Sequence, residues 1–177
     1  AIALQALVFF LINVGVLQAT VSQVAAAAAR QNEYKSSGWI AFLAKTVAAF
    51  GLLIFVAGWF VLPWIGELFY DNREVGMWAW WLCAMPLIEL PKVVATAAFQ
   101  GTRRMLALGQ LENAYDMMRF FLVVCGAIVT GSPVGALVGL LLTSAVGAVL
   151  SAALYHRARS DGGYPLPSAR DIIQRAR

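Results

Sequence analysis

Long apolar stretches separated by short polar turns constrain this chain more than any other feature of its sequence. In the stretch 38–69, for example, only Lys45 and Glu67 are charged, and an α-helix needs about 20 mostly apolar residues to cross a bilayer. Over the whole chain of 177 residues, 61% are hydrophobic and 12% are charged, and the mean hydropathy is +0.75. A soluble domain carries about 25% charged residues. The composition therefore excludes a soluble globule, a disordered chain and a nucleic-acid-binding domain.

The apolar stretches predict an all-α polytopic membrane protein. Five transmembrane helices are expected, at about residues 1–29, 38–69, 76–100, 106–130 and 134–155. The second is longer than a span requires, so a tilt, a bend before Pro63 or an interfacial extension must absorb the excess. The third contains Pro86 and Pro91 and is expected to be kinked. Residues 156–177 are predicted to form a basic cytoplasmic tail or linker, in which Ser168 caps a short interfacial helix.

Positive charges are distributed unevenly between the two ends of these predicted helices. Only Arg73 falls at one end, in the turn before the third helix, whereas nine residues fall at the other: Arg30, Lys35, Arg103, Arg104, Arg157, Arg159, Arg170, Arg175 and Arg177. Because positively charged loops stay in the cytoplasm during insertion, we expect a multi-pass protein of the cytoplasmic membrane with a cytoplasmic tail. Residue 1 would then face outward, and we expect at least one further helix before it.

Ionisable residues inside the predicted spans are the main candidates for function. An ionisable side chain at the bilayer centre costs about 2.5–3.5 kcal/mol on insertion scales. Glu89 and Lys92 are three residues apart in the third helix, whereas the fourth carries Glu112, Asp116 and Arg119 at spacings that share one face. Counted from the loop 101–104 at 1.5 Å per residue, the charges of both helices lie at similar depths of about 12–22 Å.

Two interpretations of these five charges remain open. They can form an ion-pair network that only fixes a helical hairpin. Alternatively they line a hydrated transport cavity, where an acid binds H⁺ or Na⁺ and a cation meets a phosphate. Weaker candidates for lining a cavity are Asn13, Gln18, Gln23 and Lys45. The three amides can instead hydrogen-bond between helices, and Lys45 can extend its ammonium group to the cytoplasmic interface.

The fifth predicted helix carries small residues four positions apart, namely Gly135, Gly139, Thr143 and Gly147. Such a face lets another helix approach closely, so we interpret these residues as a packing surface.

No pattern in the chain indicates an enzyme. Cys83 and Cys125 lie within apolar stretches and are interpreted as small buried hydrophobic residues rather than a disulfide or a metal pair. We find no nucleophile elbow, zinc-binding helix or phosphate-binding loop. We therefore expect no catalytic residues, no metal and no cofactor.

Several local motifs resemble those of a transporter family. They are Arg30-Gln31-Asn32-Glu33 after the first span, the run Ala98-Phe99-Gln100-Gly101-Thr102-Arg103-Arg104-Met105, and Leu111-Glu112-Asn113. Together with a glycine-rich last span that ends in arginines, they resemble the polysaccharide (lipid-linked oligosaccharide) flippases of the multidrug/oligosaccharidyl-lipid/polysaccharide exporter superfamily. The resemblance would place the five spans at the second to sixth helices of the amino-terminal bundle, so that the remainder of the chain lies outside this sequence.

The resemblance implies two pseudo-symmetric helix bundles around a polar cavity that opens alternately to each membrane face. Its substrate would be a lipid-linked glycan, whose diphosphate would meet cations of the cavity, with membrane lipids as partners and H⁺ or Na⁺ as the coupling ion. The first predicted span departs from this picture because it has no Arg or Lys. The alternatives are a drug or metabolite antiporter of the same superfamily and a structural membrane subunit without transport activity.

Overall fold

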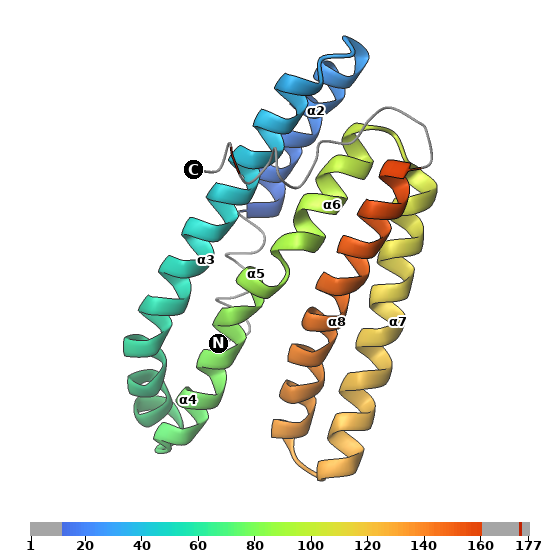
Figure 1. Ribbon diagram of the computed structural model, residues 1–177. Coiled ribbons are helices and arrows are strands. Elements are labelled where there is room, and N and C mark those ends of the chain that lie inside the picture. Colours follow the sequence, from blue (N-terminus) through green and yellow to red (C-terminus); the bar gives the residue numbers. More distant parts are fainter. Residues whose placement is uncertain (1–11, 161–173, 175–177) are drawn as a thin grey trace.

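The computed structural model describes residues 12–160 and residue 174, and these residues form helices and turns with no strand (Figure 1). A short π-helix, η1, leads into α2, and a single 3₁₀ turn, η2, lies between α4 and α5. The elements are η1 (Ile12–Leu17), α2 (Gln18–Ala29), α3 (Glu33–Tyr70), α4 (Arg73–Trp81), η2 (Leu82–Ala84), α5 (Met85–Ile88), α6 (Leu90–Gly101), α7 (Met105–Thr130) and α8 (Pro133–Ser160).

Four helical segments of the described chain are long and apolar enough to cross a membrane. They are Tyr34–Phe69, Arg73–Gly101, Met105–Thr130 and Pro133–Ala158, the second of which combines α4, η2, α5 and α6. The predicted first span is represented by a shorter apolar helix, Gly15–Ala29, and residues 1–11 lie outside the described residues. The helices confirm an all-α chain of the kind found in multi-pass membrane proteins.

Each of the four turns between the long helices contains one residue in the left-handed backbone conformation: Gln31, Asp71, Arg103 or Gly131. A residue of this conformation ends many helices because it redirects the chain while its N–H still bonds the last turn. α3 begins at Glu33, five residues before the predicted position, because the side chain of Asn32 accepts a hydrogen bond from the N–H of Lys35 at 3.0 Å.

The third span is interrupted at its two prolines. Proline lacks the N–H that a helix interior requires, so it is accommodated in the first turn of a helix. Pro86 and Pro91 lie at the starts of α5 and α6, and Glu89 is the residue between the two helices. The Glu89 N–H still donates to the Met85 carbonyl at 2.8 Å. The interruption is therefore a local break in one continuous span, whereas α3 passes through Pro63 as a single helix.

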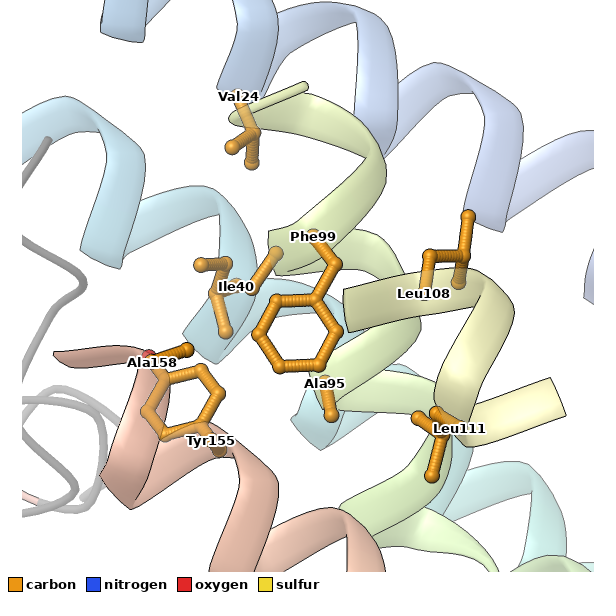
Figure 2. Packing of buried hydrophobic residues seen from close by; sticks show 9 residues of the cluster. Val24, Ile40, Ala95, Phe99, Leu108, Leu111, Tyr155 and Ala158 are labelled. Atoms are coloured by element: carbon orange, nitrogen blue, oxygen red, sulfur yellow. The ribbon is translucent and has the colours of Figure 1, made fainter. Parts of the chain in front are cut away.

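A buried cluster joins all the long helices near one end of the bundle. Figure 2 shows Phe99 of α6 surrounded by side chains of the neighbouring helices, with its ring centroid 6.2 Å from that of Tyr155 in α8. The cluster comprises Val24, Ile40, Ala95, Ala98, Phe99, Leu108, Leu111, Tyr155 and Ala158. It fixes the α7–α8 hairpin against α6 and thereby determines which polar side chains can meet.

The basic ends of the helices lie together. The α2–α3 turn, the α6–α7 turn and the end of α8 lie at the upper end of the bundle in Figure 1, and the α3–α4 and α7–α8 turns lie at the lower end. The guanidinium group of Arg104 donates to the carbonyl of Ala158, which ties the α6–α7 turn to α8. α8 itself continues to Ser160, beyond the predicted end at Tyr155. Ser168 and the predicted tail helix lie outside the described residues.

Candidate functional site in the membrane-spanning region

A buried carboxyl group connects three of the helices. Glu89, at the α5–α6 junction, is only 7% exposed. Its Oε1 accepts a hydrogen bond from the hydroxyl of Tyr115 in α7 and another from the hydroxyl of Ser144 in α8, the latter at 2.8 Å. Both donors converge on Oε1, so Oε2 takes part in neither bond. Buried polar groups need such partners because an unpaired one is costly.

Lys92 lies on the same side of the third span, one helical turn after Glu89. Its Nζ is 3.1 Å from the centroid of the Tyr115 ring, a cation–π contact that places the ammonium group beside the Glu89 cluster. The charges that act on Lys92 are the carboxylates of Glu89, Asp116 and Glu112 and the guanidinium group of Arg119. Lys92 and Glu89 therefore both contact Tyr115, and the three charges of α7 are within electrostatic range of Lys92.

The three charges of α7 lie along a strip that other described residues leave uncovered. Glu112, Asp116 and Arg119 are all exposed. Asp116 is close to the middle of the helix, about 17 Å from Met105 and about 21 Å from Thr130 at the α-helical rise. In a helix that crosses a membrane, this strip is at the depth of the hydrocarbon core.

Three different faces can be distinguished on α7. Leu108 and Leu111 are buried in the cluster of Figure 2, and Tyr115 is buried where its ring meets Gly147 of α8. Phe121 follows Glu112 by two and a half helical turns and therefore points the opposite way from the charged strip. It belongs to an exposed apolar face that suits contact with lipid, formed by Met117, Phe121, Val124 and Ile128.

The small residues of α8 face α7. A Cβ on Gly139 would lie 2.8 Å from the carbonyl carbon of Leu122, and one on Gly147 would lie 2.6 Å from the Tyr115 ring. Gly135 opposes Gly126 in the same way. The Thr143 hydroxyl donates to the Gly139 carbonyl at 2.8 Å within α8, so it does not reach across the contact. Because Gly147 leaves room for the Tyr115 ring, α8 determines where the Tyr115 hydroxyl points.

The weaker candidates lie apart from this cluster or outside the described side chains. Gln18 and Gln23 of α2 and Lys45 of α3 are exposed. The side chain of Asn13 lies outside the described part of the structure. Cys83 is buried and Cys125 is exposed, and both are free thiols. Among the described residues no group of histidine, cysteine and carboxylate side chains could hold a metal ion.

A pocket between the third span and α8 carries none of this chemistry. It has a volume of about 250 Å³ and is lined by Trp78, Trp81, Leu82, Leu137, Val138 and Leu141. With only aliphatic and aromatic side chains around it, the pocket cannot hold a charged ligand. The pocket therefore adds nothing to the ionisable groups around Glu89 and α7.

Two members of the Glu89 cluster were not predicted from the sequence. Tyr115 stands between Glu112 and Asp116 in α7, and Ser144 follows Thr143 in α8. The presence of a buried carboxyl in the third span was a signal that hydroxyl donors would be required. Nothing in the spacing indicated which of the many Ser, Thr and Tyr residues would supply them.

Comparison with known proteins adds no relative: no family model, curated protein or solved structure matches this chain.

Proposed function

We propose that this chain is part of a membrane transporter that moves a lipid-linked oligosaccharide or polysaccharide precursor across the cytoplasmic membrane by alternating access. The observation that carries the proposal is the charged strip of α7, namely Glu112, Asp116 and Arg119, which is exposed halfway along a helix that can span a membrane.

Lipid cannot be the environment of this strip. Charges at this depth are tolerated where they face a water-filled cavity or other protein. Phe121 and its neighbours form an exposed apolar side of α7 that suits contact with lipid, which supports a polar space on the side of the strip. A polar space at mid-membrane depth, beside a broken helix, is the usual location of a transporter's binding site.

The mixed charge of the strip suits the proposed substrate. Arg119 and Lys92 supply cations, and guanidinium and ammonium groups are the side chains that bind phosphate. Glu112 and Asp116 supply carboxylates that can exchange a coupling H⁺ or Na⁺. The resemblance of Gln100–Arg104 and Leu111–Asn113 to the lipid-linked oligosaccharide flippases supports this substrate class, and the positive helix ends support a cytoplasmic location for the loop that carries Gln100–Arg104.

The proposal is tested by translocation of a fluorescent polyprenyl-diphosphate glycan in proteoliposomes that contain the full-length protein. A lectin added outside reports the fraction of glycan that has crossed. Neutralising the strip with Glu112→Gln, Asp116→Asn and Arg119→Gln together is expected to slow translocation at least about tenfold, which corresponds to about 1.4 kcal/mol in the barrier.

Glu67→Gln is the matched control, because Glu67 is an exposed carboxylate near the end of α3 and far along the chain from the strip. It is expected to retain the parent rate. Undiminished translocation by the triple variant would overturn the role of the strip. Gradient-driven exchange of a small organic cation, with no glycan translocation, would instead indicate an antiporter, and inactivity with a stable stoichiometric protein partner would indicate a structural subunit.

A further inference from the structure

We propose that Glu89 is a proton-binding site that switches the contact between the α7–α8 hairpin and the α5–α6 junction. This inference concerns helix packing and does not require the substrate proposed above. It starts from the convergence of the Tyr115 and Ser144 hydroxyls on one oxygen of a carboxyl that is 7% exposed. Oε2, which neither hydroxyl occupies, is the oxygen that takes the proton.

The hydrogen bonds that Tyr115 and Ser144 donate to Glu89 are strong when Glu89 is ionised. A hydrogen bond to a carboxylate is about twice as strong as one between neutral groups. The two bonds join α7 and α8 to a break between two helices that each carry a proline in their first turn. Adding a proton to Oε2 removes the charge from the carboxyl group and weakens both bonds at once.

A second acceptor, the Leu140 carbonyl, is within reach of the Ser144 hydroxyl when Glu89 is protonated. The hydroxyl oxygen of Ser144 lies 2.8 Å from Glu89 Oε1 and 3.2 Å from the Leu140 carbonyl within α8. A hydroxyl has one proton and can donate to only one acceptor at a time. The hydroxyl can therefore turn from Glu89 to Leu140 and leave no unpaired donor, which releases α8 from the α5–α6 junction.

The surrounding charges favour a proton over a metal ion. Lys92 lies beside Tyr115, and Arg119, Glu112 and Asp116 are the other charged groups of α6 and α7 that act on this region. α2 has no titratable residue, and Lys45 of α3 is exposed. The titratable residues of α8 are confined to its last two turns. A sodium ion at Glu89 would need several oxygen ligands close to the ammonium group of Lys92, whereas a proton forms one covalent bond with Oε2 and leaves an O–H that needs a single acceptor.

The proton is detected by infrared difference spectroscopy of the full-length protein in lipid nanodiscs as the pH is lowered. Other carboxyl groups are protonated as well, so the band of Glu89 is defined as the C=O intensity of the parent protein that Glu89→Gln lacks at the same pH. The matched control Glu67→Gln, which removes an exposed carboxylate near the end of α3, is expected to keep this component. Identical C=O bands in the parent and in Glu89→Gln would overturn the assignment.

Two further variants keep the test decisive if Glu89→Gln does not fold. Tyr115→Phe removes the donor that stays on Oε1 after Ser144 has turned to Leu140, so the C=O band is expected to move to higher frequency, whereas Ser144→Ala is expected to leave the band near the parent frequency. An unmoved band in Tyr115→Phe would place the protonated carboxyl elsewhere. Replacing choline with Na⁺ at constant pH is expected to leave the band unchanged, and loss of the band under Na⁺ would show a metal site instead.

The switch in packing is read by hydrogen exchange in the same samples. After correction for the intrinsic pH dependence of amide exchange, the backbone amides around Ser144 and Glu89 are expected to have lower protection factors at low pH in the parent protein, and low protection factors at every pH in Glu89→Gln. Protection factors that are independent of pH in the parent would contradict the switch even if the carboxylic band is present. Because neither readout depends on glycan, this result is independent of the translocation assay.

Discussion

Gly139 lies where α8 packs against the backbone of α7, and its replacement tests this packing directly. A Cβ at this position would be 2.8 Å from the Leu122 carbonyl carbon and 2.9 Å from the Val123 Cα, whereas ordinary contacts begin near 3.4 Å. The obstructing atoms belong to a helix backbone and cannot rotate away as a side chain would. The Leu122 carbonyl oxygen is closer still, so Gly139→Ala must push the two helices apart by at least about half an ångström, a shift far larger than a packed interface absorbs freely.

The size of the effect follows from two opposing contributions. Overpacking of a well-packed contact costs about 1–3 kcal/mol, and replacing glycine by alanine in a helix returns about 0.5–1 kcal/mol. We expect Gly139→Ala to lower the free energy of unfolding by about 1–2 kcal/mol. Gly109 of α7 is the matched control because a Cβ there would meet nothing within 4 Å, so Gly109→Ala is expected to raise the same quantity by about 0.5–1 kcal/mol.

Both variants can be measured by SDS titration of the detergent-solubilised protein, followed by circular dichroism. The two variants are expected to change the free energy of unfolding in opposite directions. This is decisive because a general effect of alanine would change it in the same direction in both. If Gly139→Ala is as stable as Gly109→Ala, the helices are not in backbone contact at this position and the reasoning is wrong.

Two further predictions concern single hydrogen bonds. Asn32 caps α3, because its Oδ1 accepts a hydrogen bond from the Lys35 N–H at 3.0 Å. Asn32→Ala is therefore expected to lower the free energy of unfolding by about 1 kcal/mol in thermal or SDS unfolding. Asn32→Asp should restore the parent value, and equal losses in both variants would exclude a capping role. Trp80→Phe keeps an aromatic ring beside Phe55 and Trp59 but removes the indole N–H that donates to the Phe55 carbonyl at 2.8 Å. It is expected to destabilise the α3–α4 contact by about 0.5–1.5 kcal/mol, and an unchanged unfolding midpoint would show that the ring alone holds the contact.

Much of the helical architecture can be predicted from local sequence, because the signals that end a helix are local. The run Gly131-Ser132-Pro133 produces the turn between α7 and α8, where Gly131 adopts the left-handed conformation. Pro86 and Pro91 similarly predict the interruption of the third span, since neither residue can donate the hydrogen bond that a helix interior needs.

The partners of Glu89 could not be predicted in this way. Counting residues from a loop gives the depth of a side chain in a span, but it does not give its direction around the helix axis relative to a neighbouring helix. That direction is set by packing, here by Phe99 against Tyr155 and by Gly147 against the Tyr115 ring. Depth alone brings Glu89 near Arg119, whereas packing makes the hydroxyls of Tyr115 and Ser144 its hydrogen-bond donors.

The central claim is that the charged strip of α7 faces a polar space within the membrane, and cysteine labelling tests it most directly. With Cys83 and Cys125 replaced by alanine, Asp116→Cys and Phe121→Cys are each exposed to a membrane-impermeant thiol reagent, added to either side of native membranes. We predict that position 116 is labelled from at least one side and that position 121, on the lipid-facing side of the same helix, is not. Equal labelling of both positions, or none at position 116, would contradict the account.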